Sequence, residues 1–241
     1  MSKLIGFVAF RKDSKRLEGK NGRVLGGKSL YQRALEKLVI LQDEGLLAMV
    51  VASTDSMEWR EDCLREFGSK ITLHERPSTV SDDLSSDTDV IRHFLSSREN
   101  ADSYAVLLFL CTYPFASVEM LRELILKHRD TGLSIFAVKE CQYFPQKLLR
   151  CKGDVLRPYF FEKMNEFECN TQKLKAQYPA AYIGTSSYLI ANANRVLQEG
   201  ADLWHQDDIQ YVVEEGERVV DIDTLEDFKL AEFLLDSGIE K

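Results

Sequence analysis

The 241-residue sequence lacks several features that mark particular classes of protein. No stretch approaches the ~20 consecutive apolar residues of a membrane-spanning helix. The N-terminus shows no charged region followed by an apolar segment and a cleavage site. We therefore expect neither a membrane segment nor a signal peptide.

Cysteine and histidine are scarce and are not spaced as metal ligands. The five cysteines form no Cys-x-x-Cys pair, and the four histidines form no spaced pair. This pattern argues against a zinc ribbon and against a disulfide framework, and it favours a reducing cytoplasm. The serine pairs Ser85–Ser86 and Ser186–Ser187 lack the context of a hydrolase nucleophile, so a hydrolase is not supported.

Charge is unevenly distributed along the chain. The net charge is −8, which argues against nucleic acid as the main partner. Residues 10–23 nevertheless carry six cations and two anions, whereas the chain from Glu199 onward carries 14 acidic and three basic residues. A local positive field in an acidic protein attracts a small polyanion. The alternative, a solvated basic turn, stays open.

Apolar runs alternate with segments of helical periodicity, which predicts an α/β fold with a mostly parallel sheet and helices on both faces. This alternation of predicted strands and helices stops after Lys139 and resumes near Ala181. We therefore expect a single domain, 1–241, with an inserted arm at about 140–180. The predicted strands are 4–10, 46–53, 71–73, 104–110, 133–139, 181–190 and 218–222. The predicted helices are 28–38, 57–67, 90–95, 118–128, 193–198 and 225–235.

Residues Gly22 to Ser29 satisfy the phosphate-loop pattern G-x-x-x-x-G-K-[ST]. That motif needs a buried strand ending directly at its first glycine. Here polar residues precede Gly22, and the interior holds Val24 and Leu25, which prefer burial. We therefore favour a turn at Gly26–Gly27 that leads into the helix at Lys28.

Asp221 and Asp223 lie at the end of the predicted strand 218–222. Alternate residues of a strand face the same side, so the two carboxylates would point together. Magnesium usually binds through one or two carboxylates plus substrate phosphates. The alternative is that Asp223 or Thr224 only caps the following helix, and the sequence leaves both interpretations open.

Taken together, these segments resemble the acylneuraminate cytidylyltransferase family, whose members activate sialic-acid-like sugars as CMP conjugates. The resemblance runs in order and spacing from residue 3 to about 235. The matching segments are Ala9 to Asn21, Gly26 to Leu30, Val51 to Asp55, Arg76–Pro77, Ser81 to Thr88, Thr112 to Pro114 and Asp221 to Asp227.

The resemblance implies a three-layer fold like that of the nucleotide-diphospho-sugar transferases. It also implies a magnesium-dependent, homodimeric enzyme that joins CMP from CTP to a 2-keto-3-deoxy sugar acid. The arm would be the dimerisation segment. The implied catalytic residues are Arg11 and Lys20, and the implied magnesium ligands are Asp221 and Asp223. The implied nucleotide-binding residues are Ala9, Arg11, Ser14, Lys20, Asn21, Arg76, Ser85 and Ser86. The implied substrate-binding residues are Thr112, Gln172 and Tyr188.

Three single positions depart from the family pattern, and so does the family's asparagine-glycine pair near Tyr188, where this chain has Gly184–Thr185 or Ser186–Ser187. Asp13 stands where many members have glycine, Leu110 where many have glutamine, and Thr171 where members acting on sialic acid usually have arginine. Two alternatives therefore stay open. One is another sugar nucleotidyltransferase on the same fold, and the other is a nucleotide-binding protein that has lost catalysis.

Overall fold

The computed structural model describes residues 2–81, 85–141, 148–159, 180–198, 203, 209–214 and 219–238. The chain divides into two compact units, one formed by residues 1–137 with 185–241 and the other by residues 138–184. Among the described residues, no helix is both long and apolar enough to cross a membrane.

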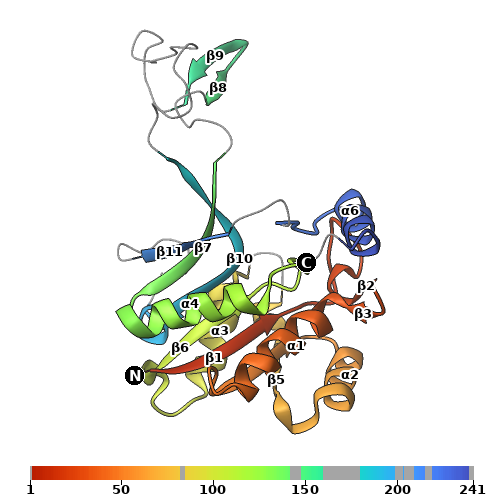
Figure 1. Cartoon of the computed structure of the whole chain (residues 1–241), viewed down its shortest axis with the longest axis vertical. Helices are drawn as coiled ribbons and strands as arrows, with labels where there is room; N and C mark the ends of the chain where they lie inside the picture. Colours follow the sequence, from red (N-terminus) through yellow and green to blue (C-terminus); the bar gives the residue numbers. More distant parts are fainter. Residues whose placement is uncertain are drawn as a thin grey trace. The chain divides into compact units, whose positions relative to one another are not determined.

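A seven-stranded sheet forms the centre of the first unit (Figure 1), in the order β11-β7-β10-β6-β1-β4-β5. β1 pairs with β4 and β6 in parallel, β4 pairs with β5 in parallel, and β10 runs antiparallel to β6. The strands are β1 (Lys3–Ala9), β4 (Met49–Thr54), β5 (Thr72–Glu75), β6 (Tyr104–Phe109), β7 (Ser134–Glu140), β10 (Tyr182–Asn192) and β11 (Ile209–Val213).

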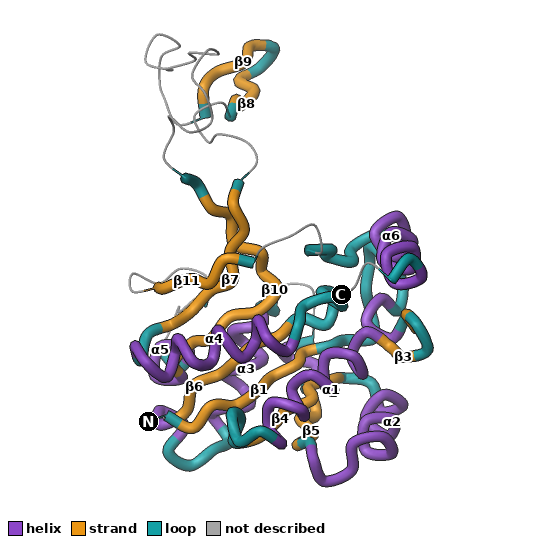
Figure 2. The backbone as a smooth tube through the Cα atoms, viewed as in Figure 1, coloured by secondary structure: helices purple, strands orange, loops and turns teal. Residues whose placement is uncertain are grey.

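Helices cover both faces of this sheet, because the central strands alternate their apolar side chains between two cores. In β1, Leu4 and Val8 join one core, whereas Ile5 and Phe7 join the other. The first core includes α1 (Leu30–Asp43), α2 (Met57–Phe67) and α4 (Val118–Thr131), and Figure 2 shows α1 and α4 packed over one face. The second core includes α3 (Asp87–Ser96) and α5 (Ala193–Val196). The predicted three-layer, mostly parallel architecture is therefore present.

The segment with the phosphate-loop pattern folds as a small hairpin. β2 (Val24–Leu25) pairs with β3 (Lys28–Ser29), and the turn between them has φ of 56° at Gly26 and 83° at Gly27. Positive φ angles favour glycine, which explains both residues without a bound phosphate. Ser29 then caps α1 in a capping box with Gln32. Lys28 pairs with Glu36 on the surface.

One predicted strand is wrong. Residues 219–223 follow an irregular path rather than the end of a strand 218–222. The Ile222 amide donates to the Thr112 carbonyl at 2.9 Å, so this segment bonds to the loop after β6. β11, which was not predicted, is the edge strand of the sheet and pairs with β7. The predicted helix 193–198 is also shorter, because α5 ends at Val196.

The second unit contains a hairpin of β8 (Leu149–Lys152) and β9 (Val155–Pro158), which turns at Gly153 with φ of 61°. The arm was expected at about 140–180, and this unit spans 138–184. Large apolar side chains are exposed on its described residues. They are Leu148, Leu149, Val155, Leu156, Tyr159, Tyr182 and Ile183.

Candidate functional site

A cavity of about 660 Å³ opens where β1, β5 and β6 end. In open α/β sheets, ligands bind at the carboxyl ends of the strands, where loops rather than ladder bonds present polar groups. The lining residues are Ala9, Arg11, Ser14, Lys15, Arg16, Leu17, Lys20, Asn21, Arg76, Ser85, Ser86, Asp87, Leu110, Cys111, Thr112, Asp221 and Asp223.

Eleven of the thirteen predicted site residues line this cavity. Gln172 lies outside the described residues. Tyr188 does not line the cavity, because it lies in β10 opposite Phe109 and its side chain is buried in the core. The structure therefore brings the predicted nucleotide and metal residues together, and it places Tyr188 in the core.

Polar contacts hold the basic loop after β1 in place. The Asn21 amide donates to the Arg11 carbonyl at 2.9 Å, and its Oδ1 accepts from the Cys111 thiol at 3.2 Å. Asp55 accepts a bond from the Lys12 amide at 2.9 Å, which fixes the start of the loop. Gly19, with φ of 61°, allows the turn into the 3₁₀ helix η1 (Lys20–Gly22). The cations are thus presented by an ordered loop.

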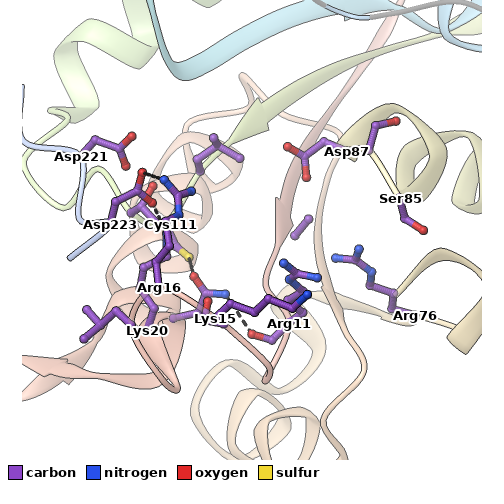
Figure 3. Close-up of a pocket in the computed structure, with 17 residues that line it drawn as sticks. Arg11, Lys15, Arg16, Lys20, Arg76, Ser85, Asp87, Cys111, Asp221 and Asp223 are labelled. Carbon is purple, nitrogen blue, oxygen red and sulfur yellow. Dashed lines mark hydrogen bonds and ion pairs between the residues drawn. The ribbon is translucent and has the colours of Figure 1, made fainter. Parts of the chain in front are cut away.

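Positive charge dominates the cavity. Figure 3 shows Arg11 and Arg76 near Asp87, with Asp221 and Asp223 on the opposite side. Burial raises the pKa of the Asp87 carboxyl, while Arg76 and Arg11 lower it. The cations among the lining residues are Arg11, Lys15, Arg16, Lys20 and Arg76, and the anions are Asp87, Asp221 and Asp223. A site with this balance suits a polyanion.

The two predicted metal ligands are held in different ways. Asp223 accepts bonds from Lys20 Nζ at 2.7 Å and from Arg16. Asp221 accepts a bond from the Tyr113 hydroxyl at 3.1 Å. Thr224, not Asp223, caps α6 (Leu225–Asp236), in a capping box with Asp227. Capping therefore does not account for the Asp223 carboxylate.

The chemistry of the donors fits a hard divalent cation. Two carboxylates offer oxygen ligands of the kind that magnesium prefers, with substrate phosphates and water completing its shell. Among the described residues, no group of three or more His, Cys, Asp or Glu side chains could hold a metal ion. A metal here would therefore depend on the ligand for much of its coordination.

Several lining residues were not predicted as site residues. Arg16 and Lys15 belong to the basic loop, and the charge count over residues 10–23 was a signal that could have identified them. Asp87 and Cys111 gave no such signal. Burial raises the pKa of the Cys111 thiol to about 12, so it stays protonated at neutral pH and is not poised as a nucleophile.

Two of the departures can now be placed. Leu110 lines the cavity and is partly buried. Asp13 lies outside this cavity, in a smaller one of about 350 Å³ that also borders Arg11 and Ser14. Thr171 lies outside the described residues. The acidic side chain at position 13 is thus kept out of the main cavity.

Comparison with known proteins identifies relatives along the whole chain. A family model described as cytidylyltransferase matches residues 5–149. The chain is 26% identical over 246 residues to CMP-N,N'-diacetyllegionaminic acid synthase of Legionella pneumophila, covering 99% of this chain and 98% of that protein.

Two solved structures share the fold. One is 4-diphosphocytidyl-2C-methyl-D-erythritol synthase of Anaerococcus prevotii, with a TM-score of 0.65, 12% identity and coverage of 98% of this chain and 99% of that one. The other is CMP:2-keto-3-deoxy-manno-octonic acid synthetase complexed with CTP, with a TM-score of 0.64, 17% identity and coverage of 98% and 100%.

The lining of the cavity predicts that Lys20 contributes to polyphosphate binding and that Lys28 does not. Lys20→Ala should weaken binding of inorganic tripolyphosphate about tenfold or more, because a hydrogen bond to a charged group contributes about 1.5–3 kcal/mol. Lys28→Ala should change it less than twofold, since Lys28 pairs with Glu36 and does not line the cavity. Isothermal titration calorimetry measures the dissociation constant of tripolyphosphate for both variants. The reverse ranking would support a phosphate loop at Gly22–Ser29.

Proposed function

Because the chain belongs to the cytidylyltransferase family, we propose that it transfers CMP from CTP to the anomeric hydroxyl of a 2-keto-3-deoxy sugar acid of the nonulosonate kind and releases pyrophosphate. The observation that carries this proposal is the single cavity that combines the family's basic loop with Arg76 and the two aspartates. The full-length similarity to a CMP-nonulosonate synthase supports the class of sugar.

The reaction forms one bond and breaks another at the α-phosphorus of CTP. The anomeric oxygen of the sugar acid attacks and its hydroxyl proton is released to solvent, the bond from the α-phosphorus to the oxygen that bridges to the β-phosphate breaks, and pyrophosphate leaves with that oxygen and the bonding electrons. Such transfer needs positioning and charge neutralisation more than covalent chemistry by the protein. Arg11, Lys15, Arg16 and Lys20 line the cavity from one loop, so they can hold the triphosphate and the departing pyrophosphate.

Asp221 and Asp223 are the residues that would hold magnesium. The ion, when bound, would neutralise charge on the phosphates of CTP. Asp223 is paired with Lys20 and Arg16 in the structure. Binding of the triphosphate would offer these cations a new anionic partner and would leave the Asp223 carboxylate available to the metal.

The proposed nucleotide can be tested by thermal shift with the four nucleoside triphosphates and magnesium. A ligand present at 100 times its dissociation constant raises the free energy of unfolding by about 2.7 kcal/mol. For a chain of this size, that should raise the melting temperature by roughly 5–10 °C. We expect the largest shift with CTP, and pyrophosphate release when CTP is combined with a nonulosonate.

The outcome separates the remaining alternatives. Turnover with another triphosphate or sugar phosphate would indicate a different sugar nucleotidyltransferase. Tight CTP binding without turnover across a panel of sugar acids would indicate a nucleotide-binding protein without catalysis. Equal shifts for all four nucleotides would contradict base selectivity.

Asp223→Asn should lower kcat by at least about a hundredfold, the scale expected when one electrostatic group is lost. Folding should be near normal, because Thr224 provides the helix cap. Glu226→Gln is the matched control, since it removes one charge from an exposed position in the first turn of α6. Asp227 is less suitable, because its carboxylate accepts the Asp223 and Thr224 amides. Normal turnover by Asp223→Asn at saturating magnesium would contradict the metal assignment.

A homodimer is the proposed assembly, and the exposed apolar side chains of the 138–184 unit support it. Large exposed apolar patches commonly mark interfaces. Light scattering should give about twice the chain mass of 27.6 kDa. Leu156→Glu should shift the protein toward the monomer, whereas Leu64→Glu on α2, at a similarly exposed leucine, should not. A wild-type monomer that remains active would contradict the proposal.

A further inference from the structure

Tyr113 connects the cavity to β10, the strand that neighbours β6 in the sheet. It follows β6 in the loop that contributes Leu110 to Thr112 to the cavity, and its side chain is buried with 5% exposed. The hydroxyl carries one proton and faces two acceptors, the main-chain carbonyl of Thr185 in β10 and Oδ2 of Asp221, so that proton is shared between them in a three-centre hydrogen bond. These partners lie 72 and 108 residues away along the chain.

The same loop holds the next residue of the aspartate segment through the backbone. The Ile222 amide donates to the Thr112 carbonyl at 2.9 Å, and the Ile222 side chain is fully buried. The backbone position of Asp221 is therefore fixed by its neighbour. The side chain of Asp221 is exposed, however, so its rotamer is not fixed by packing.

We propose that Tyr113 is a positioning residue that fixes the Asp221 carboxylate for a divalent cation. This inference rests on the proposed function, because it takes Asp221 as a metal ligand. The branch of this shared bond that reaches Asp221 ends on a carboxylate and is therefore charge-assisted. The bond engages Oδ2 and leaves Oδ1 for the ion. Partners that orient metal ligands commonly contribute ten- to a hundredfold to metal affinity.

The two aspartates then have different roles when a nucleotide arrives. The partners of Asp223 are Lys20 and Arg16, cations that a triphosphate attracts. The partner of Asp221 is a neutral, buried hydroxyl that a phosphate neither attracts nor reaches. Asp221 thus keeps its orientation while Asp223 exchanges partners, so Asp221 is the pre-oriented ligand.

Binding of Mn²⁺, measured by electron paramagnetic resonance in the presence of CTP, tests this role. Tyr113→Phe should weaken Mn²⁺ binding about ten- to a hundredfold, raise the KM for magnesium, and leave kcat near the wild-type value at saturating magnesium. CTP affinity in chelator should be unchanged. Tyr31→Phe is the matched control, because Tyr31 is equally buried and its hydroxyl donates to Asp62 at 3.2 Å, away from the cavity.

Asp221→Asn distinguishes failure of this inference from failure of the proposed function. If Asp221→Asn binds Mn²⁺ as the wild type does, the metal assignment itself is wrong. If Asp221→Asn loses binding but Tyr113→Phe behaves like Tyr31→Phe, the positioning role is overturned while the metal site stands. In the Asp221→Asn background, Tyr113→Phe should lower Mn²⁺ affinity by less than a further twofold. If the two substitutions instead lower Mn²⁺ affinity by fully additive amounts, the positioning role is also overturned. Urea unfolding of each variant without metal verifies that phenylalanine preserves the buried packing.

Discussion

The ion pair between Lys20 and Asp223 spans the basic and acidic sides of the cavity. It joins a basic loop near the N-terminus to an acidic segment 203 residues later. Lys20 is only 13% exposed, so its charge lies in a medium of lower effective dielectric, where an ion pair is attracted by about 4 kcal/mol before desolvation is subtracted. Arg16 is 71% exposed, and a pair of that kind contributes about 0–1 kcal/mol. Lys20 therefore holds Asp223, and Arg16 adds little to stability while remaining available to a ligand.

This arrangement also offsets part of the positive charge of the five cations that line the cavity. Like charges repel, so nearby carboxylates reduce the cost of placing these cations together. Asp223 offsets Lys20 and Arg16 on one side, while Asp87 lies beside Arg11 and Arg76 on the other. The same carboxylates would compete with an incoming triphosphate. Under the proposed function, a divalent cation bound with the nucleotide would relieve that competition, because Asp221 and Asp223 would hold the ion and the basic side chains would be available to the phosphates.

The sequence predicts the parts of the fold that depend on local patterns. Buried strands, capped helices and the glycine turn at Gly26–Gly27 all follow from periodicity and from the chemistry of single residues. The strand expected at 218–222 fails for a non-local reason, because the Ile222 amide bonds to the loop after β6 rather than to a neighbouring strand. Tyr113 and Asp87 lie in segments that match the family pattern, but no local pattern marks either of them as a site residue. Tyr113 contacts Asp221 and Asp87 interacts with Arg11, both far away in the sequence. The basic loop, in contrast, can be recognised from its charge alone.

Leu110 sets a limit on how the base can be recognised in this chain. It lines the cavity where many family members have an amide side chain, and a leucine neither donates nor accepts a hydrogen bond. Under the proposed function, selectivity for cytosine would depend on other groups that line the cavity, such as Arg76, Ser85 and the main chain near Ala9. The guanidinium of Arg76 is held by a bond from Nε to the Val80 carbonyl at 2.6 Å, so it is fixed in direction. A guanidinium donates hydrogen bonds and accepts none, so in a fixed orientation it can bind a base carbonyl and not an amino group; under the proposed function, base selectivity therefore does not require an amide side chain at position 110.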